Sequence, residues 1–488
     1  MLRNPKLYEI NTRNWIKQFG ENATLADVPP AYFAELADRG IELIWLMGVW
    51  KTSDEVIEKC CFSPELTASY SKALPNWKKE DVIGSPYAVD DYVINPALGT
   101  ETDLLKLKCE LNKLGLKLIL DFIPNHFSAA TKYLNTHPDI FLQTDEESYK
   151  KDSFTFFKHN GNYFAHGRDP LFPAWTDTVQ VNFFNQHARD FLYEKVLKIA
   201  ELCEGIRCDM TMLPLNNVFN NTWIGVHSKN NSSKPEKEFW QEIIEKTKLK
   251  YPDFIFIGEA YWDLEWELQQ LGFDFTYDKR LLERLLSNDI QGIFAHLGAE
   301  KSYQNKSVRF IENHDENRAV TSFGKARSMA AAVVMSTIPG MKLYHDGQFT
   351  GRRTKLPVQL QREPAERLSQ TIKKFYDKLL QITLEPVFKS GEFELLSPLP
   401  SDENDLTYHG MLSWKWKLKN NLRVIVINYS EVTAQCRLKF KFDTDKETIS
   451  LIDKLTDKKY IRYVEEIKTQ GLFVELKSFN SHIFSIEL

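Results

Sequence analysis

The chain has 488 residues, of which 43% are hydrophobic and 26% charged, so its composition is that of a soluble globular protein with two or three domains. Its 62 Lys and Arg residues are slightly outnumbered by 67 Asp and Glu, which gives a formal net charge of −5. No basic excess exists to neutralise phosphates, which argues against a nucleic-acid or membrane-surface partner. No apolar run is long enough to span a membrane, and nothing in the sequence indicates an oligomeric state.

The cysteines show neither a CxxC spacing nor a zinc-binding pattern, so we expect free thiols and no metal. The six are Cys60, Cys61, Cys109, Cys203, Cys208 and Cys436. Residues Met1 to Trp15 lack the apolar stretch of a signal peptide. Together, these features predict a cytoplasmic protein.

Up to about residue 385, short apolar runs alternate with helical stretches. The predicted strands are Leu7–Asn11, Leu43–Leu46, Leu116–Asp121, Gly205–Asp209, Phe254–Glu259, Phe273–Tyr277, Val308–Glu312 and Met341–Tyr344. The predicted helices between them include Asp103–Leu114, Ala188–Leu202, Glu236–Lys250, Arg280–Leu286 and Ala326–Val334. Because strands buried on both faces read as continuous apolar runs, eight such units favour a (β/α)₈ TIM barrel. A doubly wound sheet is the second choice.

Three long insertions interrupt this alternation. Lys51–Ser85 follows the second strand, and Phe127–Asp177 follows the third and is long enough to form an inserted subdomain. Asn216–Pro235 follows the fourth strand and is rich in Asn and Ser, so we expect a surface loop there.

The pattern changes after about Gly391 to alternating strands separated by turns, which predicts an all-β domain, most simply a sandwich. The strands expected there are Leu422–Asn428, Cys436–Phe442, Thr448–Ile452, Leu472–Leu476 and His482–Ile486. The predicted division is a catalytic barrel at residues 1–126 and 178–390, a subdomain at 127–177 and a C-terminal β-sandwich at 391–488.

Polar residues collect where the predicted strands end. They are Asp121, Asn125, His126, Arg207, Asp209, Glu259, His314 and Asp315. In a TIM barrel, the carboxyl ends of the strands carry the catalytic groups. A single such residue could be a helix cap, but eight after at least four different strands indicate an active site.

Two of these carboxyls suit the cleavage of a glycosidic bond, which needs one ionised and one protonated carboxyl group. Arg207 lies two residues before Asp209, so on a strand both side chains point to the same side, and we expect the guanidinium to keep Asp209 ionised. Glu259 follows an apolar strand, where burial and a nearby anion would raise its pKa, as an acid/base requires. Asp315, with His314, could hold sugar hydroxyls.

Four segments resemble the signature regions of the α-amylase family of glycoside hydrolases, in order and in spacing. They are Asp121-Phe-Ile-Pro-Asn125-His126, Gly205-Ile-Arg207-Cys-Asp209, Ile257-Gly-Glu259-Ala260 and Phe310-Ile-Glu-Asn313-His314-Asp315-Glu-Asn-Arg318. The resemblance implies that Asp209 is the nucleophile, Glu259 the acid/base and Asp315 the transition-state stabiliser.

The same resemblance assigns supporting roles to further residues. Arg207 would be the partner of the nucleophile, His126 and His314 would bind sugar hydroxyls, and Asp121 would be a structural aspartate beneath the site. Tyr87 would stack on the sugar that is cleaved. From its position three residues after Glu259, Trp262 is a candidate platform for the leaving side of the substrate.

The chain departs from the family pattern where the family binds calcium. The usual aspartate of the segment Thr178-Val-Gln-Val-Asn182 is replaced by Gln180, and Asp209 is followed by Met-Thr-Met rather than by Lys-His. Asn125 alone is a weak ligand set for a cation that prefers six to eight oxygens. We therefore expect no cofactor. Ala88 stands where α-glucosidases often carry an aspartate, which lowers the expectation of a simple α-glucosidase pocket.

These observations predict a retaining enzyme that hydrolyses or transfers α-linked glucosyl units of oligosaccharides such as maltodextrins, through a covalent intermediate on Asp209. The motifs leave hydrolysis and transglycosylation open. One alternative is a catalytically inactive amylase-like binding protein, although such relatives typically lose the carboxylates. Another is a transferase or phosphorylase that acts on a sugar phosphate.

Overall fold

The computed structural model describes residues 2–226 and 233–487. Eight parallel strands close into a barrel in the order β1-β15-β14-β13-β12-β11-β5-β2. The strands are β1 (Lys6–Asn11), β2 (Leu43–Met47), β5 (Lys117–Phe122), β11 (Gly205–Cys208), β12 (Ile255–Gly258), β13 (Phe275–Tyr277), β14 (Ser307–Arg309) and β15 (Met341–His345). All eight expected strands are present within a few residues, and the TIM barrel is confirmed. Closure of the sheet excludes the doubly wound alternative.

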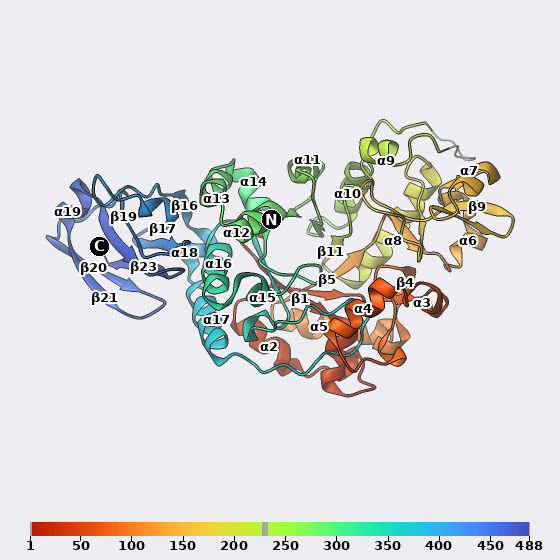
Figure 1. Cartoon of the computed structure of the whole chain (residues 1–488), viewed down its shortest axis with the longest axis horizontal. Helices are drawn as coiled ribbons and strands as arrows, with labels where there is room; N and C mark the ends of the chain where they lie inside the picture. Colours follow the sequence, from red (N-terminus) through yellow and green to blue (C-terminus); the bar gives the residue numbers. More distant parts are fainter. Residues whose placement is uncertain (1, 227–232, 488) are drawn as a thin grey trace.

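Helices cover the outside of the barrel (Figure 1). The larger ones are α2 (Pro30–Asp38), α5 (Glu101–Lys113), α8 (Gln186–Leu202), α10 (Phe239–Lys250), α12 (Lys279–Ser287), α13 (Ile290–Leu297), α16 (Lys325–Thr337) and α17 (Gln370–Ile382). Each has an apolar face to bury; in α12 this face is Leu281, Leu282 and Leu285. The start of α5 is set by a capping box in which Thr100 and Asp103 satisfy each other's backbone N–H groups.

The long insertion after β5 forms its own small structure. Its ends are the antiparallel pair β6 (His126–Ser128) and β10 (Thr178–Gln180). Between them lie α6 (Tyr133–Thr136), β7 (Gln143–Thr144), α7 (Glu146–Lys151), β8 (Phe156–His159) and β9 (Asn162–Ala165). In Figure 1 these elements lie at one end of an elongated molecule, opposite the C-terminal strands.

The insertion after β11 differs from the expected surface loop. Its first part is the helix α9 (Asn216–Thr222), in which Phe219 is only 4% exposed. The Phe219 ring packs against Phe183 and Phe184 at centroid distances of 5.5 and 5.0 Å. Burial of the Phe219 ring thus stabilises a helix in a segment whose Asn-rich composition favours a loop. Residues 227–232, which belong to the same predicted loop, lie outside the described residues.

The described part of the C-terminal region is all-β except for two short helical segments, a 3₁₀ turn at Thr407–Gly410 and α19 (Val464–Thr469). A six-stranded antiparallel sheet has the order β16-β17-β18-β23-β20-β21, and β19 pairs with β22. The strands are β16 (Glu392–Leu395), β17 (Met411–Leu418), β18 (Asn421–Asn428), β19 (Ala434–Leu438), β20 (Thr448–Asp453), β21 (Lys459–Tyr463), β22 (Leu472–Leu476) and β23 (Ser481–Glu487). Three of these strands, β16, β17 and β21, were not predicted, because alternating charged residues obscure their apolar pattern.

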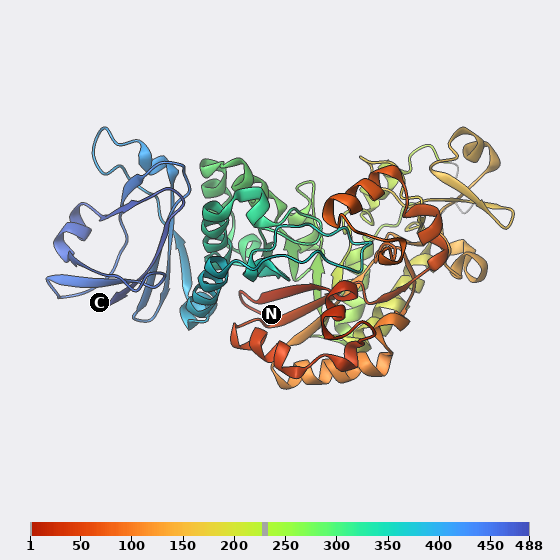
Figure 2. The ribbon, with the colours of Figure 1, turned by 60° about the horizontal axis from the view of Figure 1, so that its bottom comes forward.

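The two faces of β18 are buried in different cores. Leu422, Val424 and Val426 pack into the core of the C-terminal domain, whereas Ile425 and Ile427 join the core of the barrel. Successive side chains of a strand point to opposite faces of its sheet. One face of this sheet therefore forms the interface with the barrel. The domain therefore packs against the barrel through its sheet, as both views show (Figures 1 and 2).

Within the described residues, the structure contains no helix that combines the length and apolarity needed to cross a membrane.

Candidate active site

Two carboxyl groups stand side by side at the mouth of the barrel. Asp209 follows the last residue of β11, and Glu259 follows the last residue of β12. These strands are hydrogen-bonded neighbours with Cys208 opposite Gly258. The register therefore brings Asp209 and Glu259 to the same level at the carboxyl ends of the strands, where a TIM barrel carries its catalytic groups.

Arg207 connects these two carboxyls. Its side chain is fully buried; one terminal nitrogen lies 2.8 Å from Asp209 Oδ1, and the other lies 2.8 Å from Glu259 Oε2. The arginine expected as the partner of Asp209 is thus shared with Glu259. Three aromatic rings surround the guanidinium at 5.1 to 5.6 Å, those of Trp45, Tyr277 and Tyr87.

Glu259 has the environment of a carboxyl that stays protonated near neutrality. Burial raises its pKa to about 7 against the effect of Arg207, and the negative charges of Asp209 and Asp315 add to the rise. Its Oε2 accepts a hydrogen bond from the backbone N–H of Met210 at 2.7 Å. Its Oε1 accepts one at 2.8 Å from the hydroxyl of Tyr261, which the sequence analysis did not single out.

Asp209 differs from the expectation in one respect. The predicted contact with Arg207 is present, but the pKa of Asp209 is raised rather than held low. Burial is the largest cause, and Arg207 opposes it only in part because the same guanidinium also pairs with Glu259. The two carboxyls thus compete for one positive charge.

Asp315 is the most exposed of the three carboxyls, with 46% of its side chain accessible. Burial acts to raise its pKa, but His314, 3.0 Å away, overcomes this effect and holds the pKa well below its usual range. His314 lies between Asp315 and Glu9, whose oxygen is 2.5 Å from Nδ1. These two anions outweigh burial and raise the pKa of His314 to about 10. The imidazole is therefore a cation that orients Asp315.

Two contacts between aromatic rings involve the histidines expected to bind sugar hydroxyls, His314 and His126. The Tyr87 hydroxyl lies 2.7 Å from His314 Nε2, and the two rings stack at 5.5 Å. On the other side, the ring of His126 lies 5.3 Å from that of Trp175. Burial lowers the pKa of His126 to about 4, with Asp177 acting in the opposite direction. His126 is therefore neutral and suited to hydrogen bonding with a hydroxyl group.

Asp121 lies beneath the site, as the resemblance implied, with 1% of its surface exposed. Its carboxylate accepts hydrogen bonds from Trp45 Nε1 at 3.1 Å and from the backbone N–H of Gly48 at 2.9 Å. Gly48 has a φ of +78°, and a Cβ there would lie 2.8 Å from Pro86. The glycine thus allows the turn after β2 to reach Asp121. Burial raises the pKa of Asp121 to about 6.

These groups border a cavity of about 960 Å³. Of the expected residues, the lining includes Tyr87, His126, Asp209, Glu259 and Asp315. Arg207 and His314 contact lining residues from beneath. Asp121 lies one layer further in, where it is bonded by Trp45 and Gly48. Residues that the sequence analysis did not connect with the site also line it, namely Tyr261, Asp177, Trp175, Cys60 and Cys61. All but Tyr261, which follows β12 directly, come from the insertions after β2 and β5, whose fold is not visible in local sequence patterns.

Trp262 does not line this cavity. Trp262 and Asp263 both adopt left-handed backbone conformations, with φ of 64° and 61°. The chain turns there, and Trp262 packs half-buried against the core, while its neighbour Tyr261 reaches Glu259. The contact with Glu259 is therefore made by Tyr261, and the platform role of Trp262 stays a prediction.

The residues at the family's calcium position do not fit a cation. Gln180 Nε2 donates hydrogen bonds to the backbone oxygen of Asn125 at 3.0 Å, to its side-chain oxygen at 2.9 Å and to the oxygen of Val181 at 3.0 Å. The oxygens that a cation would need thus already accept from an amide. Across residues 2–226 and 233–487, no three His, Cys, Asp or Glu side chains are grouped closely enough to hold a metal ion.

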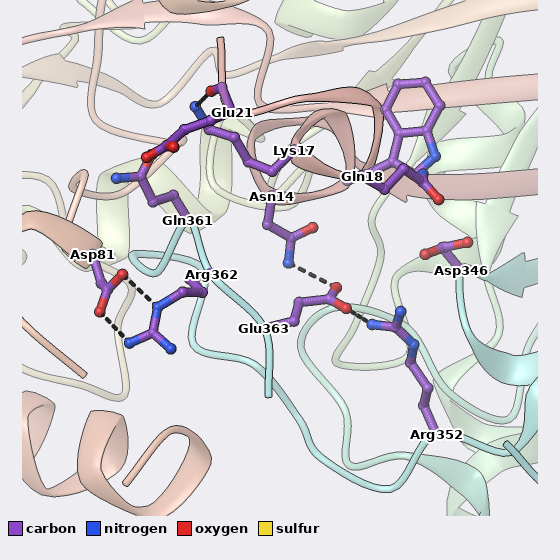
Figure 3. Close-up of a pocket in the computed structure, with 11 residues that line it drawn as sticks. Asn14, Lys17, Gln18, Glu21, Asp81, Asp346, Arg352, Gln361, Arg362 and Glu363 are labelled. Carbon is purple, nitrogen blue, oxygen red and sulfur yellow. Dashed lines mark hydrogen bonds and ion pairs between the residues drawn. The ribbon is translucent and has the colours of Figure 1, made fainter. Parts of the chain in front are cut away.

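A second cavity, of about 450 Å³, is lined in part by Gln361, Arg362 and Glu363 of the segment 355–363 (Figure 3). Arg362 forms two hydrogen bonds with Asp81, and Glu363 is bound by Asn14 and by Arg352. Gln359, from the same segment, lines the catalytic cavity instead. The segment is therefore a wall between the two cavities, anchored through its charged residues.

Comparison with known proteins identifies a family. Residues 36–378, well over half of the chain, match the model of the alpha-amylase catalytic domain. α-Amylase 3 of Dictyoglomus thermophilum is 26% identical over 306 residues, covering 57% of this chain and 56% of the relative. A cyclomaltodextrin glucanotransferase of a Bacillus species is 26% identical over 261 residues, which cover 51% of this chain and 35% of the relative. The chain thus matches about half the length, or less, of these curated relatives.

Solved structures resemble the chain over its whole length. A maltogenic α-amylase of Thermotoga neapolitana covers 99% of both chains with a TM-score of 0.71 at 19% identity. A trehalose-6-phosphate hydrolase of Bacillus licheniformis covers 99% of both with a TM-score of 0.67 at 15% identity. At these identities, the structural likeness shows a shared fold.

Proposed function

Because the chain belongs to the α-amylase family and is an enzyme of its glycoside hydrolase and transglycosylase type, we propose that it acts on α-linked gluco-oligosaccharides such as maltodextrins with retention of configuration. One observation carries this proposal: Arg207 pairs with two carboxyls on neighbouring strands, and one of them, Glu259, has a pKa of about 7. Retaining glycosidases use such a pair as nucleophile and acid/base.

The proposed reaction has two steps. Protonated Glu259 gives its proton to the glycosidic oxygen while Asp209 attacks the anomeric carbon, so that the glycosidic bond breaks and a glycosyl ester forms. The alcohol product then leaves. In the second step, ionised Glu259 takes a proton from water or from a sugar hydroxyl, whose oxygen displaces Asp209. Glu259 ends protonated and Asp209 ends ionised, as both began.

The surrounding groups hold the sugar while these steps occur. Asp315, kept ionised by His314, accepts hydrogen bonds from sugar hydroxyls, and its charge favours the oxocarbenium-like transition state. The ring of Tyr87 offers a face on which the sugar stacks, and neutral His126 offers a further hydrogen-bonding group.

The charge of the cavity favours a neutral saccharide over a sugar phosphate. The described residues that line it include six carboxyl residues and neither lysine nor arginine. A phosphoryl group would meet negative charge without a compensating cation. A reaction with a sugar phosphate is therefore the weaker candidate.

A cytoplasmic location remains a prediction from the sequence alone.

The proposal is tested by incubating the protein with each oligosaccharide from maltose to maltoheptaose, with and without phosphate, and separating the products. We expect shorter saccharides, with or without longer transfer products, and no dependence on phosphate. An Asp209→Asn variant that folds normally serves as the inactive control. Complete absence of turnover would support an inactive binding protein, and products formed only with phosphate would indicate a phosphorylase.

A further inference from the structure

A row of basic residues crosses three neighbouring barrel strands at the end opposite the active site. Lys6 of β1 is directly opposite Lys342 of β15, and Lys342 is opposite Arg309 of β14. All three are at most 5% exposed. Like charges at the same level of adjacent strands repel each other, so such a row is stable only with negative charges or hydrogen-bond acceptors beside it.

Within residues 2–226 and 233–487, only one of the three forms an ion pair. Arg309 forms an ion pair with the buried Asp278. Lys342 Nζ, in contrast, donates a single hydrogen bond, to the backbone oxygen of Gly340 at 2.7 Å. Lys6 Nζ has only two long contacts with backbone oxygens, at 3.3 and 3.5 Å. Since an ammonium group has three donors, both lysines retain unused hydrogen-bonding capacity.

Both lysines face a cavity of about 240 Å³ that the described chain forms between the barrel floor and the segment joining α17 to α18 (Pro386–Ser390). Lys389 and Glu42 also line it and form an ion pair with each other, with 36% and 28% of their side chains exposed. They therefore mark the opening of the cavity to solvent. When all three lysines and Glu42 are ionised, this lining carries a net charge of plus two.

The protein by itself does not favour that charge. Burial, reinforced by Lys389, lowers the pKa of Lys6 to about 7. Burial and the neighbouring Arg309 lower the pKa of Lys342 further. An anion between the ammonium groups would reverse both effects, because an opposite charge favours the charged form of a lysine.

We propose that this cavity binds a small dianionic oxyanion, either inorganic phosphate or the phosphoryl group of a monoester. The charge of the lining matches a dianion, and its buried ammonium groups supply the strong donors that phosphate oxygens accept. The site lies at the amino-terminal end of the barrel strands, so its ligand is not the substrate of the catalytic cavity. It links the barrel floor to α18, next to the C-terminal domain (Figure 1).

The test is calorimetric titration of the full chain with inorganic phosphate and, separately, with glycerol 3-phosphate, at constant ionic strength set with sodium chloride. We expect one saturable site per chain and a phosphate-dependent rise in Tm that chloride does not reproduce. Tighter binding of phosphate identifies the free ion as ligand, and tighter binding of glycerol 3-phosphate identifies a monoester. The absence of saturable binding of both would overturn the proposal.

Two variants locate the binding. Lys342→Met removes the central ammonium but keeps a stem of similar length, and Lys389→Ala removes the charge at the opening. Each should weaken binding of the tighter ligand at least about tenfold. Lys342→Met should not lower Tm in anion-free buffer, because it replaces a buried amino group, whose charged form is disfavoured there and which makes a single hydrogen bond, with an apolar group of similar length. Lys374→Ala, on an exposed lysine of α17, is the matched control and should bind as the unaltered protein does. Binding equally tight in all three variants would refute the site.

Discussion

At the scale of single residues, Arg207 determines how the active site distributes charge. One guanidinium serves Asp209 and Glu259 at the same distance of 2.8 Å, in a site where both carboxyls are buried. Burial raises the pKa of each, and a single positive charge cannot fully offset both. The site therefore favours one ionised and one protonated carboxyl, which is the state that the first step of a retaining reaction requires.

Removing either carboxyl should nearly abolish activity. We expect Asp209→Asn to lower kcat by about 10⁴-fold and Glu259→Gln by at least about 10²-fold, measured on the best substrate with circular dichroism as a check of the fold. Asp169→Asn is the matched control, because Asp169 lines the same cavity but only bonds the backbone of Leu171 and Phe172. A tenfold loss or less in either active-site variant would show that the assignment is wrong.

The pKa of Glu259 predicts the alkaline side of the pH profile. Its acid form is the reactive one, and since burial raises its pKa to about 7, this form persists to neutral pH and is lost as the pH rises through that value. We expect kcat/KM to fall about tenfold per pH unit above about pH 7. The residual activity of Glu259→Gln should lack this decline. A profile that already falls from about pH 5 would contradict the assignment.

The paired carboxyls also predict the stereochemistry. Displacement first by Asp209 and then by water restores the configuration of the substrate, so the α-anomer should appear first. Proton NMR during early turnover of a maltodextrin would show this, with the β-anomer growing only at the rate of mutarotation measured on the isolated product. Early formation of the β-anomer would exclude a covalent intermediate on Asp209.

At the scale of elements, the strand β10 places the side-chain amide of Gln180 among oxygens that a cation would need. Gln180 stands where the family resemblance implied a calcium ligand, and its nitrogen donates to three oxygens of Asn125 and Val181. The two bonds to Asn125 join β10 to the chain that precedes β6.

This arrangement predicts independence from calcium. Exhaustive dialysis against EDTA should change neither activity nor Tm, because no carboxylate takes part in the bonds around Gln180. A calcium-dependent amylase dialysed in parallel shows that the chelation was effective. Loss of activity that calcium restores would mean that a cation site exists elsewhere.

At the scale of the whole molecule, the C-terminal sheet is part of the barrel's own core. Trp414 and Trp416 of β17 are at most 2% exposed, and their indole nitrogens donate to Thr337, at the end of α16, at 3.2 and 2.6 Å. The sheet therefore shields barrel helices that would otherwise expose apolar surface to water.

We expect Trp416→Ala to destabilise the full chain by about 3–5 kcal/mol, as is typical of removing a buried aromatic side chain. The readout is the free energy of unfolding in urea, followed by tryptophan fluorescence. Tyr463→Ala, on the exposed face of the same domain, is the control and should have little effect. Unchanged stability in Trp416→Ala would show that the sheet contributes little to the barrel.

The sequence by itself determined the barrel and the identity of its reactive carboxyls, because both depend on local pattern. Buried parallel strands appear as apolar runs, and a polar residue directly after such a run must stand at the barrel mouth. Asp209 and Glu259 were found in this way. Predictions based on local composition were less accurate where tertiary packing opposes the local preference. The Asn-rich segment 216–222 was expected to be a loop, but it forms the helix α9, in which Phe219 packs against Phe184.

Only the tertiary structure decided how distant residues share charge and hydrogen bonds. That Arg207 serves both carboxyls, that Tyr261 rather than Trp262 reaches Glu259, and that Lys6 lies opposite Lys342 all depend on strand register and on backbone turns. Arg207 and Glu259 are 52 residues apart, and Lys6 and Lys342 are 336 residues apart, so no local pattern encodes these contacts. Tyr261 lies only two residues from Glu259, but the left-handed turn at Trp262 and Asp263 decides which aromatic side chain reaches the carboxyl. The physical reason is that pKa values and binding sites depend on which charges meet after folding, and not on which are neighbours in the chain.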